Sequence, residues 1–207
     1  MIVPPGYPGI AFTTADDGDV RGDQVARDEV AAQLGIPRPW AVVEQVHGST
    51  VVRATEPVSF GPADALFTTE ADLPLAVFTA DCLGVALIAD GAVGVAHAGW
   101  RGVVAGVVPN LIEAMTEAGF PPQRAGVGPG IGSCCYEVGA EVAERLAGFV
   151  SETTWGTVSV DLPGAVRDQL GALDIWEAGE CTMCSAPFHS HRVDATPARM
   201  GTIAWIT

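Results

Sequence analysis

Two histidines and one cysteine have the side chains that zinc prefers, and each is expected where a short strand begins or ends. His47 follows the apolar segment 41–46, Cys82 precedes a second apolar segment, and His97 ends a third. Catalytic zinc sites commonly take three protein ligands and leave a fourth position to water or substrate. His47, Cys82 and His97 are therefore candidate ligands of one metal ion. The alternative is that the histidines are ordinary turn residues and that Cys82 is a small buried hydrophobe.

The Asp-Gly pair at 90–91 predicts how Cys82 and His97 lie relative to each other. Asp-Gly between two apolar strands is a strong signal for a two-residue hairpin turn. Counting back from that turn along both strands places Gly84 opposite His97. Opposed residues share a face of the sheet, and so do residues two apart on one strand. Cys82 and His97 are therefore predicted to be diagonal neighbours on one face of the hairpin.

The segments that must position these residues are a mixture of helices and short strands. Apolar residues at helical spacing predict helices over 23–34, from 104 to 115 with a kink or restart at Pro109, from 138 to 146, and from Pro163 onward. Short apolar segments predict strands over 41–46, 50–54, 75–79, 83–89, 92–97, 175–178 and 202–206. Close hairpins among mixed elements indicate an α+β fold with mixed, largely antiparallel sheets. Since no repeat or linker divides the chain, residues 1–207 are expected to form a single domain.

The composition suits one hydrophobic core and excludes one class of partner. Of the 207 residues, 48% are hydrophobic and 17% are charged, so the chain can bury a core without disulfides. The net charge is -15, and all ten basic residues are arginines. Because a general phosphate-backbone binder needs a basic face, no nucleic-acid partner is expected. An anionic substrate would be bound by a few arginines, whose planar fork suits phosphate or carboxylate.

The N-terminus and the cysteines predict a cytoplasmic protein without a membrane partner. Residues 1–10 are rich in Pro and Gly and lack the basic and apolar regions of a signal peptide. No apolar run reaches the ~18 residues of a membrane span, because Asp81 and Asp90 interrupt the longest candidate. Five cysteines, an odd number, favour thiols or metal ligands over a disulfide framework.

Three further motifs have simple explanations. Cys181 and Cys184 form one CxxC pair, which is a weak zinc signal without a second pair or a histidine partner. The adjacent Cys134 and Cys135 are expected to be buried thiols rather than a redox pair. The glycine-rich loop 128–132 could bind phosphate at a helix N-terminus, although such loops are more often simple turns.

Several motifs, in order along the chain, resemble a single family. They are Gln45-Val46-His47-Gly48, Ala63-Asp64-Ala65-Leu66, Thr79-Ala80-Asp81-Cys82 and the segments 96–102, 128–138, 181–184 and 188–192. From about Arg27 to its end, the chain resembles the laccase-domain family, also called the YfiH-like or polyphenol oxidase family, whose members include purine nucleoside phosphorylases. The resemblance implies a layered α/β/β/α sandwich in which helices cover two packed sheets.

The resemblance also implies a reaction and a cofactor. His47, Cys82 and His97 would be the ligands of zinc, with copper the less favoured metal. The reaction would be phosphorolysis of adenosine, inosine and methylthioadenosine, accompanied by adenosine deamination. A zinc-activated water suits the deamination, since the metal lowers the pKa of water. The small-molecule partners would be purine nucleosides and phosphate, while the oligomeric state stays open between a monomer and a weak homodimer.

Four charged residues are candidates for the rest of the site. Arg27 takes the place of an arginine in the family's N-terminal helix, and Arg192 belongs to the last motif, so both are candidates for binding phosphate. Asp64 and Asp81 are candidates for general acid-base catalysis, or for orienting a zinc-bound histidine through its second nitrogen. A turn or helix-cap carboxylate is the alternative for Asp64.

The chain departs from the family pattern in three places. Ala26 stands where an asparagine commonly precedes the helix arginine, and residues 13–21 lack the usual Ser-Leu-Asn-like segment. Thr196-Pro197-Ala198-Arg199 replaces a turn that contains glycine. The substrate preference can therefore differ from that of other members.

Three other functions remain open. Cys82 could be the catalytic nucleophile of a cysteine hydrolase, such as a peptidoglycan-editing amidase, with His97 as its base. Copper-dependent phenol oxidation is a second alternative, but multicopper centres need more histidines than the four in this chain. A zinc ion that only stabilises a partner-binding domain is the third.

Overall fold

The predicted hairpin lies at the centre of the largest sheet. In the computed structural model, which describes residues Met1–Thr207, β7 (Leu83–Ala89) and β8 (Ala92–Ala98) pair antiparallel on either side of the Asp-Gly turn. The register is the one that the turn predicts, with Gly84 opposite His97.

The strands form one large and three small sheets. The six-stranded sheet has the order β12-β9-β7-β8-β5-β3, with parallel pairs at its two ends and antiparallel pairs between them. Its other strands are β12 (Asp174–Glu177), β9 (Arg124–Val127), β5 (Ala65–Thr68) and β3 (Val51–Arg53). The remaining sheets are the antiparallel β1 (Ile10–Phe12), β13 (Met200–Ala204) and β6 (Leu75–Thr79), the parallel pair β2 (Val42–Glu44) and β4 (Ser59–Pro62), and the hairpin β10 (Val150–Glu152) and β11 (Val158–Val160).

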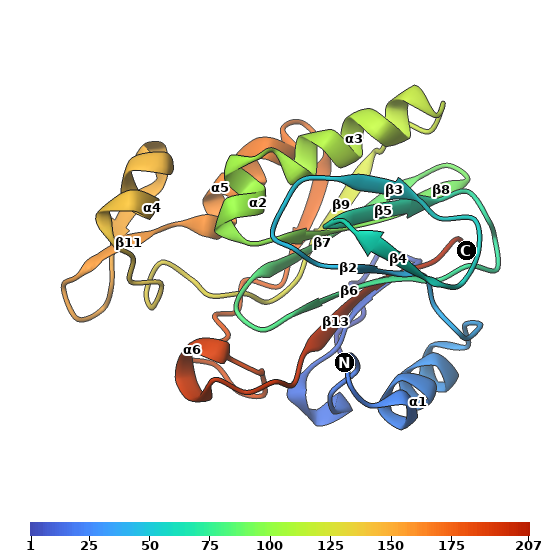
Figure 1. Cartoon of the computed structure of the whole chain (residues 1–207), viewed down its shortest axis with the longest axis horizontal. Helices are drawn as coiled ribbons and strands as arrows, with labels where there is room; N and C mark the ends of the chain where they lie inside the picture. Colours follow the sequence, from blue (N-terminus) through green and yellow to red (C-terminus); the bar gives the residue numbers. More distant parts are fainter.

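Helices cover the sheets from opposite sides, as Figure 1 shows. The helices of the chain are α1 (Gln24–Leu34), α2 (Trp100–Val104), α3 (Val107–Glu117), α4 (Ala140–Arg145), α5 (Leu162–Leu170) and α6 (His191–Asp194), with short 3-10 turns at Ala15–Asp17 and Ala147–Phe149. Of these, α4 and α6 lie off one end of the sheets. Helices α2, α3 and α5 lie along the outer face of the large sheet, and α1 lies beyond β6 and β13. This order of helix, sheet, sheet and helix confirms the predicted α/β/β/α layers. None of these helices has the length and apolar character needed to cross a membrane.

Hydrophobic clusters fill the spaces between these layers, because side chains alternate along the central strands. In β7, Val85 and Leu87 pack with the apolar faces of α3 and α5, whereas Ala86 and Ile88 pack with residues of the three-stranded sheet. A third cluster joins α1, through Val30 and its neighbours, to the far face of that smaller sheet. The large sheet is therefore buried on both faces, which explains why its central strands are continuous apolar segments.

Several predicted elements begin or end elsewhere than the sequence indicates. The helix expected to kink at Pro109 is broken at Gly106 instead, whose φ of +81° ends α2 and starts α3. Pro109 lies in the first turn of α3, where a backbone N–H would have no acceptor within the helix, so a proline costs no hydrogen bond there. The helix predicted from 138 to 146 is only the short α4, which buries none of its residues. The strands on either side of His47 belong to different sheets, since β2 pairs with β4 and β3 with β5.

The close approach of the two larger sheets predicts a cost for any side chain at Gly84. A Cβ there would meet the Thr202 hydroxyl of β13 and lie 2.7 Å from Thr202 Cβ. We expect Gly84→Ala to lower the free energy of unfolding by about 1–3 kcal/mol, the usual cost of overpacking, as measured by urea denaturation. Gly148→Ala is the matched control, because no atom lies within 4 Å of its added Cβ. Equal stability of the two variants would contradict this packing.

Candidate metal centre and its cavity

The structure brings His47, Cys82 and His97 together at one end of the central hairpin. Cys82 immediately precedes β7, His97 lies in β8, and His47 lies in the turn between β2 and β3. Their possible ligand atoms all lie within 4.8 Å of one another. The two imidazole rings are 4.7 Å apart between centroids and meet edge to face at 77°. His97 is almost fully buried, whereas His47 is exposed, so the group opens toward solvent on one side.

One buried carboxylate positions both histidines. Asp64, which has no exposed surface, accepts hydrogen bonds at Oδ1 from the backbone N–H of His47 (2.9 Å) and from the His97 ring at Nδ1 (2.7 Å). Its Oδ2 accepts from the backbone N–H groups of Gly48 (2.6 Å) and Val46 (3.2 Å). In the neutral form of His97, Nδ1 donates to Asp64 and Nε2 carries the lone pair that can bind a metal. These contacts support orientation of His97, rather than acid-base catalysis, as the role of Asp64.

The same carboxylate stabilises an uncommon backbone conformation at His47. The φ of His47 is +62°, which few residues other than glycine adopt. Three consecutive N–H groups, those of Val46, His47 and Gly48, point to Asp64 and hold the turn in this form. Burial would raise the pKa of Asp64, but the hydrogen bonds from His97, Gly48 and His47 outweigh burial and lower it. Asp64 is therefore an ionised acceptor.

Electrostatics in the centre favour the form of Cys82 that binds metals. Burial raises the pKa of the Cys82 thiol, but hydrogen bonds with His47 and His97 outweigh burial and lower it to about 6. Burial lowers the pKa of His97, while hydrogen bonds with Asp64 and Cys82 raise it to about 9. The neighbouring histidines thus stabilise a thiolate at Cys82. A metal cation bound in place of the thiol proton would interact with the negative charge of that thiolate.

A glycine preserves the space in which an ion would lie. A Cβ at Gly99 would be 3.0 Å from Cys82 Sγ, 3.1 Å from His47 Cδ2 and 3.8 Å from His97 Nε2. No side chain could therefore be added between the three candidate ligands without displacing them. Two imidazole nitrogens and one thiolate, with one open side, are a donor set that zinc accepts at catalytic sites.

The open side of the centre faces a cavity of about 290 Å³ that several basic residues line. This volume is near the lower limit of ~300 Å³ typical of small-molecule sites. Besides the metal centre, the charged or ionisable residues that line the cavity are Arg21, Arg192, Arg199, His191, Tyr136 and Asp81. Burial and the nearby Cys82 raise the pKa of Tyr136 to about 12, so its hydroxyl keeps its proton and can donate a hydrogen bond. Three arginines against one carboxylate suit an anionic ligand.

Arg27, one of the two predicted phosphate-binding residues, does not line this cavity. Its Nε donates to the carbonyl of Val20 (3.0 Å) and its Nη2 to the carbonyl of Arg21 (2.8 Å). The guanidinium also lies over the Phe78 ring, 5.5 Å from its centroid. Arg27 therefore fixes the segment that carries Arg21 into the cavity.

Asp81 lines the cavity and fixes the segment that forms its opposite wall. Its φ is +83°, and its Oδ1 accepts from the hydroxyl of Thr182 at 2.7 Å. Its Oδ2 accepts from the backbone N–H of Arg192 at 2.7 Å. Arg192, the other predicted phosphate-binding residue, donates from Nη1 to the carbonyl of Glu137 and leaves the rest of its guanidinium free. Asp81 thereby positions Arg192.

Two cavity arginines were not predicted from the sequence. Arg21 and Arg199 come from opposite ends of the chain, and their backbone N–H groups both donate to Asp19 Oδ1, at 3.1 and 3.0 Å. They lie in 13–21 and 196–199, the two longer segments where the chain departs from the family pattern. That shared departure is the signal in the sequence that could have identified them.

The glycine-rich loop does not lead into the N-terminus of a helix. The next helix, α4, begins only at Ala140, so no helix N-terminus follows the loop directly. Its glycines permit close packing instead, since a Cβ at Gly128 would meet the Phe12 ring and one at Gly130 would meet Leu83. Of the two alternating histidines, His191 lines the cavity and His189 does not.

Comparison with known proteins identifies the family. A family model described as multi-copper polyphenol oxidoreductase laccase matches residues 11–207. The chain belongs to this laccase-domain family. Two relatives are named purine nucleoside phosphorylase: that of Streptomyces griseus is 40% identical over 197 residues, covering 87% of this chain and 80% of the relative. That of Deinococcus radiodurans is 40% identical over 203 residues, covering 91% and 78%.

Two solved structures share the fold of this chain. YlmD from Geobacillus stearothermophilus superposes with a TM-score of 0.85 at 30% identity, covering 99% of this chain and 94% of that one. The hypothetical protein YfiH of Bacillus licheniformis has the same TM-score, 0.85, at 23% identity, covering 99% and 98%. The chain therefore shares its fold with these two structures at low sequence identity.

Removal of one Asp64 oxygen predicts a loss of metal affinity. In Asp64→Asn, the amide NH2 would face N–H donors, so the His47 turn and the His97 ring would lose part of their support. We expect zinc affinity to fall by about 10–100-fold, as is usual when the partner of a metal-binding histidine is replaced. Competition with a chromophoric chelator measures the affinity, and circular dichroism checks the fold.

Asp168→Asn is the control for Asp64→Asn, because it removes the same charge from an exposed position of α5. Equal zinc affinity in the two variants would show that Asp64 does not orient the ligands.

Proposed function

We propose that this protein is a zinc-dependent purine nucleoside phosphorylase with adenosine deamination as a second reaction of the same cavity. The observation that carries the proposal is the combination of a His-Cys-His centre with an arginine-lined cavity on its open side. The relatives named purine nucleoside phosphorylase support it. We infer adenosine, inosine and methylthioadenosine as substrates, with phosphate as the attacking group.

Zinc suits this centre better than copper does. Zinc bound by His47, Cys82 and His97 would supply Lewis acidity, with one coordination position left for water or substrate. The family description names copper, but type 2 and type 3 copper centres are rich in imidazole, and the chain has only four histidines. Two of these, His189 and His191, are outside the group of candidate ligands. We therefore propose zinc as the resident metal.

The arginines would bind the phosphate. In phosphorolysis, a phosphate oxygen replaces the base at the anomeric carbon of the ribose, and the departing base takes up a proton. Arg21, Arg192 and Arg199 would hold the phosphate by charge-assisted hydrogen bonds. Arg199 donates from Nη1 to the carbonyls of Thr196 and Ala198, which fixes its guanidinium while its other nitrogens stay free. The protonated hydroxyl of Tyr136 is a further donor in the cavity.

A direct assay tests the proposal. We expect the zinc-loaded protein, incubated with adenosine and phosphate, to release adenine and ribose 1-phosphate, together with some inosine. His47→Ala should lower turnover by about 100-fold or more, because Lewis-acid catalysis contributes several kcal/mol. The exposed position of His47 predicts that the fold is kept, which circular dichroism checks. Chromatography of the products measures the reaction.

Two results, one from this assay and one from metal-free protein, would contradict the proposal. Absence of adenine, hypoxanthine and inosine with zinc fully loaded would exclude nucleoside processing. The chain Asp64–His97–Cys82 also has the order of an orienting acid, a base and a nucleophile, which keeps a cysteine hydrolase as the second candidate. Amidase activity in metal-free protein, lost on alkylation of Cys82, would favour that hydrolase. Protection of Cys82 from alkylation by zinc would favour the metal centre.

The cavity arginines predict a separate effect on phosphate. We expect Arg21→Ala and Arg199→Ala each to raise the KM for phosphate by about tenfold or more, since hydrogen bonds to charged groups contribute about 1.5–3 kcal/mol. Steady-state kinetics at saturating nucleoside measure this. Arg145→Ala, in exposed α4, is the control. A large increase in the KM for phosphate in Arg27→Ala, with no increase in Arg21→Ala, would instead assign phosphate binding to Arg27.

A further inference from the structure

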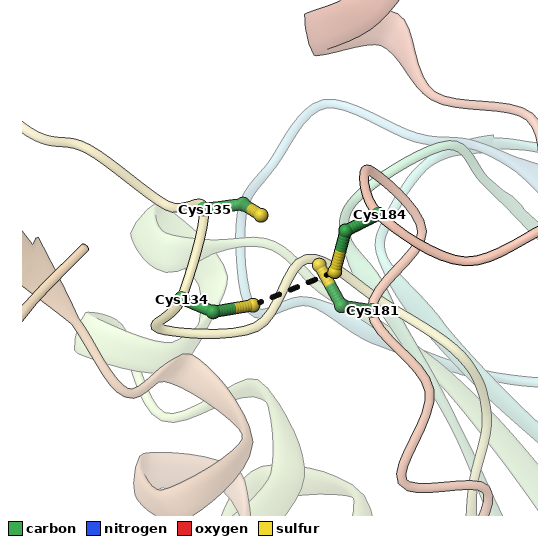
Figure 2. Close-up of side chains that lie close together, drawn as sticks. All are labelled: Cys134, Cys135, Cys181 and Cys184. Carbon is green, nitrogen blue, oxygen red and sulfur yellow. Dashed lines mark hydrogen bonds between the residues drawn. The ribbon is translucent and has the colours of Figure 1, made fainter. Parts of the chain in front are cut away.

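Four of the five cysteines converge at a place separate from the metal centre, as Figure 2 shows. Cys134 and Cys135 follow β9, and Cys181 and Cys184 follow β12. The four sulfur atoms all lie within 4.8 Å of one another. The fifth cysteine, Cys82, belongs to the His-Cys-His centre. The CxxC pair Cys181 and Cys184 is a weak zinc signal in the sequence because it lacks a second cysteine pair. In the structure, Cys134 and Cys135 are that second pair.

The spacing of these sulfur atoms fits a tetrahedral metal site. Zinc binds cysteine sulfur at about 2.3 Å, which places two sulfurs of a tetrahedron about 3.8 Å apart. Cys134 Sγ and Cys184 Sγ are 3.8 Å apart. The cluster lies at the surface, with Cys135 and Cys181 buried and Cys184 exposed, so an ion could enter from solvent.

The backbone around Cys181 is arranged to stabilise a thiolate. The N–H of Gly132 donates to Cys181 Sγ at 3.3 Å. Donors on a sulfur favour its charged form, which is the metal ligand. Gly132 also keeps the space open, since a Cβ there would lie 3.3 Å from Cys134 Sγ and 3.7 Å from Cys181 Sγ.

Apolar packing around this cluster is thin. The hydrophobic cluster here has three buried residues, Ile131, Cys135 and Cys181, and two of them are the cysteines themselves. The segment from Cys181 to Ser190 contains turns but no helix or strand. A segment with so little core and so few backbone pairs needs another source of stability, and a structural metal is a common one.

We propose that Cys134, Cys135, Cys181 and Cys184 form a closed structural zinc site that joins the loop after β9 to the segment after β12. Zinc binding releases the thiol protons to solvent and involves no change of oxidation state. Four protein ligands leave no position for substrate, so this site has a structural role. The proposal does not rest on the proposed nucleoside chemistry, because this zinc would not contact the substrate.

The proposed site holds together two walls of the cavity. Tyr136 follows Cys135 directly, and its ring stacks with Arg192, whose guanidinium lies 5.4 Å from the ring centroid. Thr182 follows Cys181 and donates to Asp81. Zinc at the cysteines would therefore position Tyr136 and Arg192 without contacting the substrate.

Metal content tests the proposal with the whole chain. We expect two zinc ions per chain in the wild type and one in the double variant His47→Ala/Cys82→Ser, which removes the first centre and leaves only the four clustered thiols. Adding Cys184→Ser to that double variant should remove the remaining zinc. With cobalt in place of zinc, the double variant should show intense thiolate-to-metal charge-transfer absorption, which only the four clustered cysteines could produce.

The double variant itself keeps the four cysteines, so the proposal can fail even if Cys184→Ser does not fold. No zinc and no cobalt-thiolate absorption in the folded double variant would overturn it. A disulfide between any of the four cysteines, found by mass spectrometry after purification in reductant, would overturn it also. One zinc per chain in the wild type, lost in the double variant, would assign the only metal to the His-Cys-His centre.

Discussion

The candidate metal centre depends on the buried carboxylate of Asp64. Burying an ionised carboxylate is unfavourable unless donors surround it, and here four N–H groups do so. Asp64 stands just before β5, and it holds both the His97 ring of the neighbouring β8 and the turn that carries His47. Since β2 and β3 on either side of that turn belong to different sheets, the ligand geometry follows from how the sheets pack.

Carboxylates that accept several hydrogen bonds also position the segments around the cavity. Asp81 accepts from Thr182 and from the backbone of Arg192, while Asp19 accepts from the backbones of Arg21 and Arg199. In each case a carboxylate fixes an irregular segment through N–H or O–H donors. This arrangement explains how so acidic a chain can form a basic cavity: acidic groups hold the backbone of the walls, and the arginine side chains face inward.

Features that depend on local sequence could be predicted, and features that depend on distant contacts could not. The Asp-Gly turn predicted the register of Gly84 against His97, and apolar spacing predicted the helix over 23–34 that is α1, because these signals act over a few residues. Asp19 and Arg199 are 180 residues apart, and the two cysteine pairs join separate loops. No periodicity or turn signal reports such contacts. Arg27 was a candidate because of its place in the family's N-terminal helix, and only the fold shows that Arg21, and not Arg27, lines the cavity.

The two thiol-containing groups differ in ways that follow from their surroundings. His47, Cys82 and His97 offer three mixed donors around a space kept open by Gly99, with the fourth side toward the arginines. The four clustered cysteines offer a complete set of soft donors between two loops that have little other packing. An incomplete set beside a cavity suits exchange of water and substrate, whereas a complete set suits permanent cross-linking. The four-cysteine site would then hold one wall of the cavity in place through Tyr136 and Arg192. The His-Cys-His centre, with its open coordination position, would face the same cavity.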